Sequence, residues 1–176
     1  MPELILTGIR DAALTLLEAT ALALVLRTFV FTLTRVKGHS MNDTLRDGDL
    51  MYVSVLTRRL FGLRRGDVVI CRYPGRKERF VKRLVALPGD RISCVEGQVM
   101  VNGQPQAQAY VTHPVPWQNF DEITLAPGTY FVMGDNRRNS HDSRSRDVGP
   151  IARVSGVARA IIWPPQRIRS LKRPIH

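Results

Sequence analysis

Three short segments of this 176-residue chain carry side chains that are suited to acyl-transfer chemistry. In the first, the polar turn Gly38 to Leu45, Ser40 offers a hydroxyl, and the nearby glycine lets backbone N–H groups approach a developing oxyanion. A serine hydroxyl is a weak nucleophile, so it needs a base within hydrogen-bond reach. On its own, a serine in such a segment more often marks only a turn.

The second segment, Phe80 to Val85, has the composition of a strand and contains a candidate base. Strand alternation places Lys82 on the same face as Phe80 and Leu84. A lysine at its reference pKa of about 10.4 is protonated at neutral pH, but burial against apolar neighbours lowers that pKa. Lys82 is therefore a candidate general base. The alternative is an edge-strand lysine that reaches solvent.

The third segment, Met133 to Arg144, gathers acids, amides, hydroxyls and arginines in a loop after a predicted strand. Such a cluster can form a hydrogen-bonded scaffold that orients catalytic groups, or it can be a solvated loop. His39 adjoins Ser40, and His141 adjoins Asp142. A Ser–His–Asp triad is disfavoured, because residues adjacent in sequence seldom have the required geometry.

The elements that position these segments are predicted to be short strands. Runs rich in Val, Ile, Tyr and Phe alternate with Gly, Asp and Pro turns, which is typical of a mainly antiparallel β domain. Residues 103–120 contain three prolines and are predicted to be a surface excursion, and the arginine-rich tail after Pro164 is expected to be exposed. The predicted strands are Asp49–Val55, Asp67–Arg72, Arg79–Ala86, Arg91–Val95, Gln98–Val101, Thr129–Met133 and Val154–Ile162.

The N-terminal region differs from the rest in being apolar. Ala12 to Leu26 form a run of 15 residues in which Glu18 is the only charge, and an extension to Leu33 gives 22 residues but includes Arg27. A bilayer core of about 30 Å requires about 20 helical residues, so this run predicts a membrane anchor. A buried core helix is the alternative. A cleavable signal peptide is disfavoured, because the small-residue triplets lie inside the run.

The charge of the chain restricts its partners. Lys and Arg total 26 against 15 acids, a formal net charge of +11 that favours nucleic acid or an anionic membrane surface. The chain has neither zinc-finger spacing nor an RNP-like motif, and the apolar N-terminus favours the membrane. Cys71 and Cys94 are too few for a disulfide scaffold. They are expected to be buried apolar side chains, with a single disulfide as the alternative.

Together these motifs resemble the signature segments of bacterial type I signal peptidases, in the family's order. Arg27 to Phe31, Tyr130 to Met133 and Trp163-Pro164 are also similar to the family pattern, so the resemblance covers nearly the whole chain. The short insert resembles the compact forms of Gram-positive bacteria. The residues that carry the resemblance are Ser40-Met41 with Thr44-Leu45, Lys82-Arg83 with Pro88-Gly89-Asp90, and Gly134-Asp135-Asn136-Arg137 with Asn139-Ser140 and Asp142-Ser143-Arg144.

The resemblance implies a role for each site residue. Ser40 would be the nucleophile, with its backbone N–H in the oxyanion hole, and Lys82 would be the base. Ser140 would hydrogen-bond the lysine amine. Asp142 and Arg144 would form a supporting ion pair, and Asp135 and Arg137 would brace the loop. Gly38 and Met41 would flank the nucleophile, and neither a metal nor a cofactor is implied.

Two positions depart from the family pattern. Some members have a serine where this chain has Gly38, so a second oxyanion donor must come from the backbone or elsewhere. The family usually has proline at the position of Asp43, and proline would fix φ and remove a donor. The Asp43 carboxylate could instead cap the turn.

The resemblance also implies a division of the chain and a location. Residues 1–34 would form a membrane anchor and interface segment, and residues 35–176 an extracytoplasmic β-rich catalytic domain with a short insert around 91–126. The fold would be an antiparallel β-sheet peptidase domain with one N-terminal transmembrane helix, in a single-pass protein of the cell membrane. The positive-inside rule favours the opposite orientation, because most flanking basic residues follow the apolar run.

The implied activity is removal of signal peptides from exported preproteins after small residues, with anionic lipid headgroups as further partners and no nucleic acid. The oligomeric state stays open. A self-cleaving serine–lysine repressor is one alternative, but it would need an N-terminal helix-turn-helix and would lack the Gly134-Asp135-Asn136-Arg137 segment. A binding-only relative is another, although Ser40 and Lys82 are both present.

An apolar cluster among arginines has two possible roles. Leu56, Leu60, Phe61 and Leu63 could rest on the membrane beside the site, or they could form a connector that packs on the core.

Overall fold

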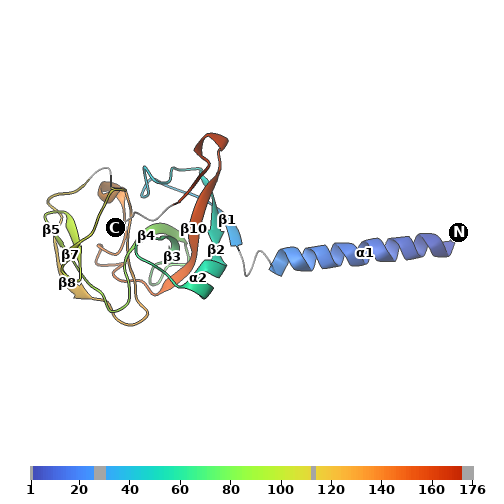
Figure 1. The fold of residues 1–176 in the computed structure, drawn as a ribbon, viewed down its shortest axis with the longest axis horizontal. Coiled ribbons are helices and arrows are strands. Elements are labelled where there is room, and N and C mark those ends of the chain that lie inside the picture. Colours follow the sequence, from blue (N-terminus) through green and yellow to red (C-terminus); the bar gives the residue numbers. More distant parts are fainter. Residues whose placement is uncertain (1, 26–30, 112–113, 172–176) are drawn as a thin grey trace.

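The computed structural model describes residues 2–25, 31–111 and 114–171. A single helix, α1 (Pro2–Val25), extends away from a domain built of two antiparallel sheets (Figure 1). The mainly β, antiparallel architecture predicted from the sequence is therefore confirmed. Because α1 is one uninterrupted helix, this part of the chain forms no helix-turn-helix.

The larger sheet carries the segments that contain Ser40 and Lys82. Its strand order is β1-β2-β10-β3-β4-β9, and β11 pairs with β10 outside this path. The long central strand β10 is antiparallel to both β2 and β3, and β3 is antiparallel to β4. These strands are β1 (Phe31–Arg35), β2 (Leu50–Ser54), β3 (Val68–Arg72), β4 (Phe80–Ala86), β9 (Phe131–Met133), β10 (Arg153–Trp163) and β11 (Arg169–Ser170).

The smaller sheet has the order β7-β6-β5-β8 and packs against the end of the larger one. Ala86 of β4 and Phe131 of β9 share a fully buried cluster with Ile92 and Val99 of the smaller sheet, so one core joins the two sheets. The cysteines are both unpaired and buried, as the first of the two interpretations expected. The strands are β5 (Arg91–Val95), β6 (Gln98–Val101), β7 (Gln104–Pro105) and β8 (Phe120–Thr124).

All seven strands predicted from the sequence are present, each within two residues of its expected ends. They are β2 to β6, β9 and β10. The sequence missed β1, β7, β8 and β11. Strand β8 has four exposed residues out of five, so it shows none of the alternation that burial of one face produces. Strand β7 lies within residues 103–120, which were predicted to be loop.

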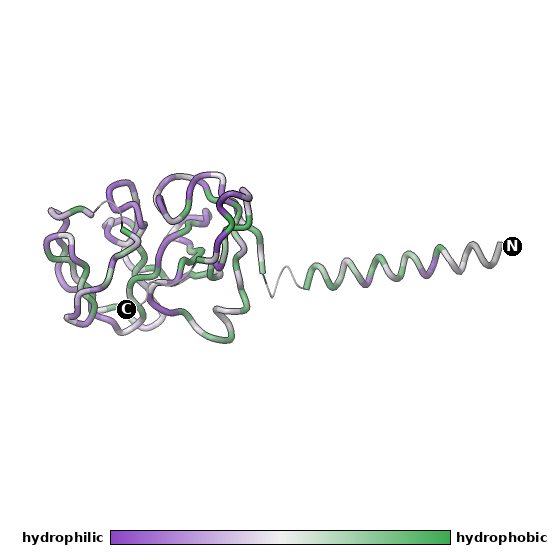
Figure 2. The backbone as a smooth tube through the Cα atoms, turned by 45° about the horizontal axis from the view of Figure 1, so that its top comes forward, coloured by the Kyte–Doolittle hydropathy of each residue, from purple (hydrophilic) through white to green (hydrophobic). Residues whose placement is uncertain are grey.

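The N-terminal helix ends before the longest apolar run considered does. It ends at Val25, and Phe31 to Arg35 pair with β2 as strand β1, so the extension to Leu33 as helix is wrong. The rest of that run, residues 26–30, lies outside the described residues. Arg10, Asp11 and Glu18 interrupt the apolar sequence of α1, and the helix includes hydrophilic positions along its length (Figure 2).

Over the described ranges, no helix combines the length and the hydropathy needed to cross a bilayer.

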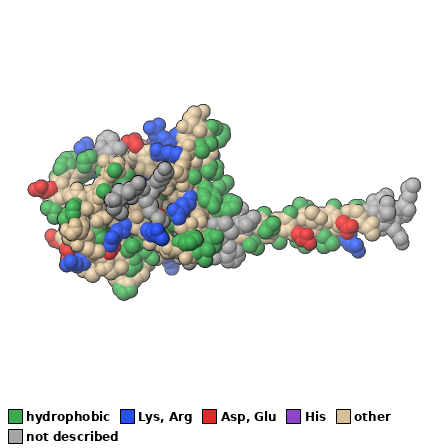
Figure 3. Space-filling model, viewed as in Figure 1, with side chains coloured by type: hydrophobic (Ala, Val, Ile, Leu, Met, Phe, Trp, Pro, Cys, Tyr) green, Lys and Arg blue, Asp and Glu red, His purple; other side chains and the backbone are tan. Residues whose placement is uncertain are grey.

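A short helix, α2 (Val55–Phe61), follows β2 directly. Ser54 caps it, since the serine hydroxyl accepts a hydrogen bond from the Thr57 backbone N–H at 3.1 Å. Leu60 and Phe61 are 65% and 68% exposed, whereas Leu63 packs against the core. The connector interpretation is therefore confirmed for Leu63, whereas Leu60 and Phe61 do not pack on the core and their contact with a membrane stays a prediction. Hydrophobic side chains gather on the side of the domain from which α1 extends (Figure 3).

Candidate active site

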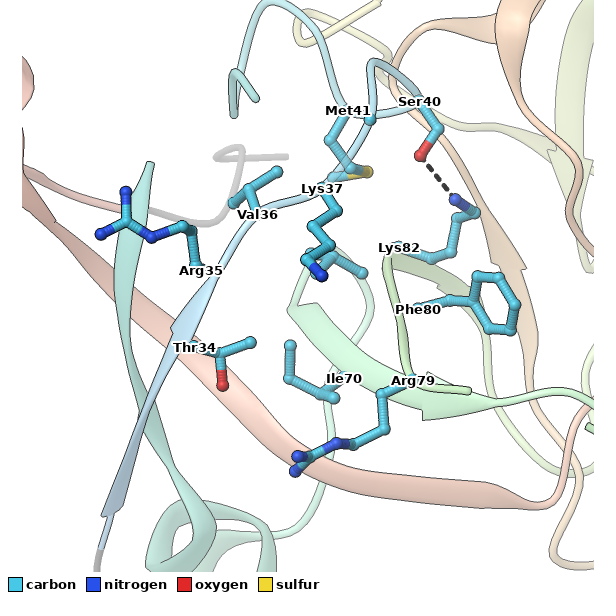
Figure 4. A pocket seen from close by; sticks show the side chains of 12 residues that line it. Thr34, Arg35, Val36, Lys37, Ser40, Met41, Ile70, Arg79, Phe80 and Lys82 are labelled. Atoms are coloured by element: carbon cyan, nitrogen blue, oxygen red, sulfur yellow. Dashed lines mark hydrogen bonds between the residues drawn. The ribbon is translucent and has the colours of Figure 1, made fainter. Parts of the chain in front are cut away.

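Ser40 and Lys82, which are 42 residues apart in the sequence, meet at hydrogen-bond distance. Lys82 Nζ lies 2.6 Å from Ser40 Oγ (Figure 4). Ser40 is half-buried in the turn between β1 and β2, and Lys82 lies in the middle of β4. The two side chains are therefore placed for proton transfer from the hydroxyl to the amine.

The surroundings of Lys82 favour its neutral form. The residue is only 3% exposed, and its partner across the sheet is Val69, which belongs to the same buried cluster as Cys71 and Leu84. This burial lowers the pKa of Lys82, and the nearby Arg144 lowers it further. The carboxylates of Asp142 and Asp135 and the Cys71 thiol act in the opposite direction.

Asp142 is the fully buried centre of the loop after β9. Its carboxylate accepts hydrogen bonds from Arg144 Nε at 2.7 Å, from the Ser140 hydroxyl at 2.7 Å and from the Gly134 N–H at 2.8 Å. Burial alone would raise the pKa of Asp142, but these bonds and the Arg144 charge lower it below its usual value. The expected Asp142–Arg144 ion pair is present. The Ser140 hydroxyl bonds to Asp142, whereas the sequence predicted a bond to the lysine amine.

Asp135 forms a second buried ion pair, with Arg83. Arg83 donates to the carboxylate from Nε at 2.8 Å and from Nη2 at 2.6 Å, and the Thr44 hydroxyl donates to it at 2.6 Å. Arg83 lies opposite Met133, the last residue of β9, and Asp135 follows two residues later in the loop. The network links the Ser40 turn, the lysine strand and the loop after β9.

Arg137 braces the same loop by a different route. Its Nε donates to the Gly134 carbonyl at 3.1 Å, and its Nη1 donates to the side chain of Gln108. The residue is 5% exposed, and burial lowers the pKa of its guanidinium. Its Nη2 is buried and has no hydrogen-bond partner in the described structure.

Gly134 allows the loop after β9 to lie directly against the nucleophile turn. A Cβ at this position would lie 2.4 Å from the Ser40 carbonyl oxygen and 2.2 Å from the Ser140 hydroxyl, so no side chain fits. The next contact is made by Asn136, whose N–H donates to the Ser40 carbonyl at 3.1 Å and whose side chain donates to the His39 carbonyl at 3.2 Å. Close backbone approach thus requires glycine here.

The remaining predicted residues occupy supporting positions. Met41 is 2% exposed and anchors the Ser40 turn in the core, and Gly38 has a φ of 89° and donates its N–H to Asp47 at 2.7 Å. His141 lies at the surface, 3.0 Å from Asp147, and the His39 side chain is exposed, so neither forms a triad with Ser40. Among the described residues, no group of His, Cys, Asp and Glu could hold a metal ion.

The turn after Ser40 is capped by a residue that the sequence did not single out. Asp49, and not Asp43, accepts a hydrogen bond from the Arg46 N–H, at 2.9 Å. Asp43 is exposed and contributes its carbonyl to Arg169.

Comparison with known proteins matches this geometry to a family. The family model described as "Signal peptidase, peptidase S26" matches residues 9–163, which include both catalytic candidates and the whole loop after β9. This chain belongs to the signal peptidase family. The self-cleaving repressor alternative is thereby set aside, in agreement with the single N-terminal helix.

Curated relatives support the same assignment. The chain is 31% identical to a signal peptidase I of Bacillus amyloliquefaciens, with 94% of each chain covered. It is 34% identical to signal peptidase I T of Bacillus subtilis (strain 168), over 88% of this chain and 85% of that protein. A crystal structure of a signal peptidase I from Enterococcus faecalis V583 superposes with a TM-score of 0.47 at 29% identity, covering 54% of this chain and 95% of that one.

Several residues of this signal peptidase site were missed by sequence reasoning. Arg83 and Thr44 lie inside the quoted motifs but were given no role. The available signal was a charged side chain in an apolar strand for Arg83 and a hydroxyl in the nucleophile turn for Thr44. Gln108, Tyr110 and Gln118 gave no signal, because nothing in the sequence indicates which loop residues pack on the buried arginines.

The C-terminal tail supports the nucleophile turn, although it was predicted to be merely exposed. Arg167 forms a bidentate pair with Asp49, both distances being 2.9 Å. Arg169 donates to the Thr44 carbonyl at 2.6 Å and to the Asp43 carbonyl at 3.4 Å. These contacts fix the tail on the segment that follows Ser40.

We expect Arg169→Gln to reduce kcat/KM for a peptide substrate by about two- to fivefold, or ~0.4–1 kcal/mol, because the turn loses a charged donor. The Tm should change little, since Arg169 is exposed. The measurement is steady-state kinetics beside Arg153→Gln, an exposed arginine of β10 that serves as the control. Equal kinetics for both variants would show that the tail does not support the turn.

Proposed function

We propose that this chain, a serine endopeptidase of the signal peptidase family, removes signal peptides from preproteins through an acyl-enzyme formed on Ser40. The contact of 2.6 Å between Ser40 Oγ and the buried Lys82 Nζ is the observation that supports this most directly. A buried, neutral amine is the base that a serine needs at neutral pH.

In the proposed reaction, neutral Lys82 takes the Ser40 proton while Oγ attacks the carbonyl carbon of the scissile peptide. The Ser40 backbone N–H, which makes no hydrogen bond within the described part of the chain, would stabilise the oxyanion. As the C–N bond breaks, the lysine ammonium gives its proton to the departing amine of the mature protein. Neutral Lys82 then activates water, which hydrolyses the ester and releases the signal peptide.

A pocket beside the catalytic pair supports binding of an extended peptide. It runs between the end of β1 and the facing strands β3 and β4, with Ser40 and Lys82 at one side (Figure 4). The apolar residues Val36, Met41 and Ile70 form part of its lining, and we propose that they receive the small residues that precede the cut. The pocket is lined by Thr34, Arg35, Val36, Lys37, Gly38, Ser40, Met41, Ile70, Arg79, Phe80, Val81 and Lys82.

The proposal extends to location. Residues 1–34 would attach the protein to the cell membrane, although β1 already begins at Phe31, and residues 35–176 would act on the extracytoplasmic side. The exposed Leu60 and Phe61 of α2 supply apolar surface for contact with lipid, and the net charge of +11 suits anionic headgroups.

The test is incubation of the purified full-length chain in liposomes with a precursor that has alanine at the first and third positions before the cut. We expect one cleavage, which mass spectrometry places after the first of these alanines. The same precursor with phenylalanine at that position should stay intact, because the proposed activity is cleavage after small residues. Cleavage of both precursors, or of neither, would contradict the proposed function.

A further inference from the structure

Three buried arginines lie in β4 and in the loop after β9, the two segments that adjoin the catalytic pair, but only two carboxylates balance them. The side chains of Arg83 and Arg144 are 3% and 6% exposed, and they pair with Asp135 and Asp142. Arg137 is 5% exposed and has no carboxylate partner among the described residues. A buried, unbalanced cation is costly, so its surroundings must compensate by other contacts.

One segment covers all three arginines. We define it as the strap, residues 108–111 and 114–119. The Tyr110 ring stacks on Arg83, with its centroid 4.0 Å from Cζ. The Gln108 side-chain oxygen accepts a hydrogen bond from Arg137 Nη1, and the Gln118 oxygen accepts one from Arg144 Nη1. Thus each buried arginine receives at least one contact from a segment that was predicted from the sequence to be only a surface excursion.

The strap is held in place by the hairpin turn between β5 and β6. The Gly97 N–H donates to the Gln118 carbonyl at 3.0 Å, and the Glu96 N–H donates to the Asn119 side chain at 2.6 Å. A Cβ at Gly97 would lie 2.5 Å from the Val115 carbonyl oxygen and 2.9 Å from the Pro116 Cα. Both clashing atoms belong to the strap backbone, so the strap can lie this close only against glycine.

We propose that the strap is a positioning element for catalysis: by holding Arg144 on Asp142, it keeps the charge around Lys82 balanced so that the lysine can act as a base. This inference rests on the proposed function of the Ser40–Lys82 pair. The strap itself touches neither Ser40 nor Lys82 in the contacts described, so it acts through the arginines.

The charges that face Lys82 explain the direction of the effect. Asp142 and Asp135 from the loop after β9, and Cys71 from β3, favour the protonated lysine, whereas Arg144 favours the neutral one. If Arg144 moves away from Asp142, the uncompensated carboxylate stabilises the ammonium form. Less of the base is then available at neutral pH, and activity is recovered as the pH rises.

The experiment compares Gly97→Ala with Gly103→Ala. The two glycines have nearly the same φ, 77° and 78°, so both substitutions cause similar backbone strain, but nothing lies within 4 Å of a Cβ at Gly103. We expect Gly97→Ala to lower kcat/KM at pH 7 by roughly three- to tenfold, a part of the ~10²- to 10⁴-fold contribution of a general base. In a plot of kcat/KM against pH, the acidic limb of Gly97→Ala should move to higher pH. The acidic limb of Gly103→Ala should stay where it is in the wild type.

A second pair of variants keeps the test decisive if Gly97→Ala fails to fold. Gln118→Met removes the acceptor for Arg144 and nearly preserves side-chain volume. Its control is Gln106→Met, because the Gln106 side chain bonds to the Gln104 carbonyl and not to an arginine. The acidic limb of Gln118→Met should also move to higher pH. If the pH profiles of kcat/KM for Gly97→Ala and Gln118→Met match those of their controls, the inference is overturned. If the wild type cleaves no precursor, the proposed function is overturned instead.

Discussion

Replacement of Ser40 by alanine or of Lys82 by methionine should each reduce kcat by roughly 10³-fold or more while leaving the fold intact. Ser40→Ala removes the nucleophile, and Lys82→Met removes the amine but keeps the length and the apolar stem. The two losses should not add in the double variant, because either change alone abolishes the shared proton-transfer step. Single-turnover cleavage of a precursor measures the loss, and circular dichroism verifies the fold.

The control for Lys82→Met is Lys77→Met, which alters an exposed lysine and should retain full activity. Near-wild-type cleavage by Lys82→Met would show that another group is the base.

In the wild-type enzyme, kcat/KM should rise with pH through the pKa of Lys82, because only the neutral amine accepts the Ser40 proton. Burial lowers that pKa below the usual lysine value, so the rise should be complete at a lower pH than an exposed lysine would give.

Asp135→Asn should lower the free energy of unfolding by about 3–5 kcal/mol, because it leaves Arg83 buried without a carboxylate. The two side chains are 3% and 0% exposed, so water cannot replace the lost partner. Urea denaturation followed by tryptophan fluorescence measures the change, with Asp121→Asn, an exposed acid of β8, as the control.

The double variant Arg83→Met with Asp135→Leu sharpens this experiment. It removes both charges, so it should recover part of the stability that Asp135→Asn loses. A loss for Asp135→Asn no larger than that for Asp121→Asn would show that the pair does not stabilise the fold. Because the Thr44 hydroxyl also bonds Asp135, a displaced Ser40 turn should lower activity in the same variant.

The candidate residues Ser40 and Lys82 and most of the sheet could be identified from the sequence, for a local reason. Strands β3 and β4 bury one or both faces, so their apolar residues and their turns are visible in the residue order. The placement of Lys82 beside Phe80 and Leu84 follows from strand alternation alone. The order of the three motifs then indicated the family, and motif order can be read from the sequence without any knowledge of the structure.

Strands β1 and β8 could not be predicted, because their pairing depends on distant partners. Phe31 to Arg35 continue an apolar run and become a strand by pairing with β2, and β8 is an exposed edge beside β5. The helical extension to Leu33 failed for the same reason: tertiary pairing outweighs a local apolar pattern.

The sequence by itself determined which residues could act, Ser40 as nucleophile and Lys82 as base, and the antiparallel architecture that carries them. Only the tertiary structure decided the partners of the buried charges: Asp135 with Arg83, Ser140 with Asp142, and the strap over Arg137. A side chain's type states what bonds it can form, but strand register and close backbone approach decide which groups come within reach. That is why the chemistry could be inferred from residue order and the network that tunes it could not.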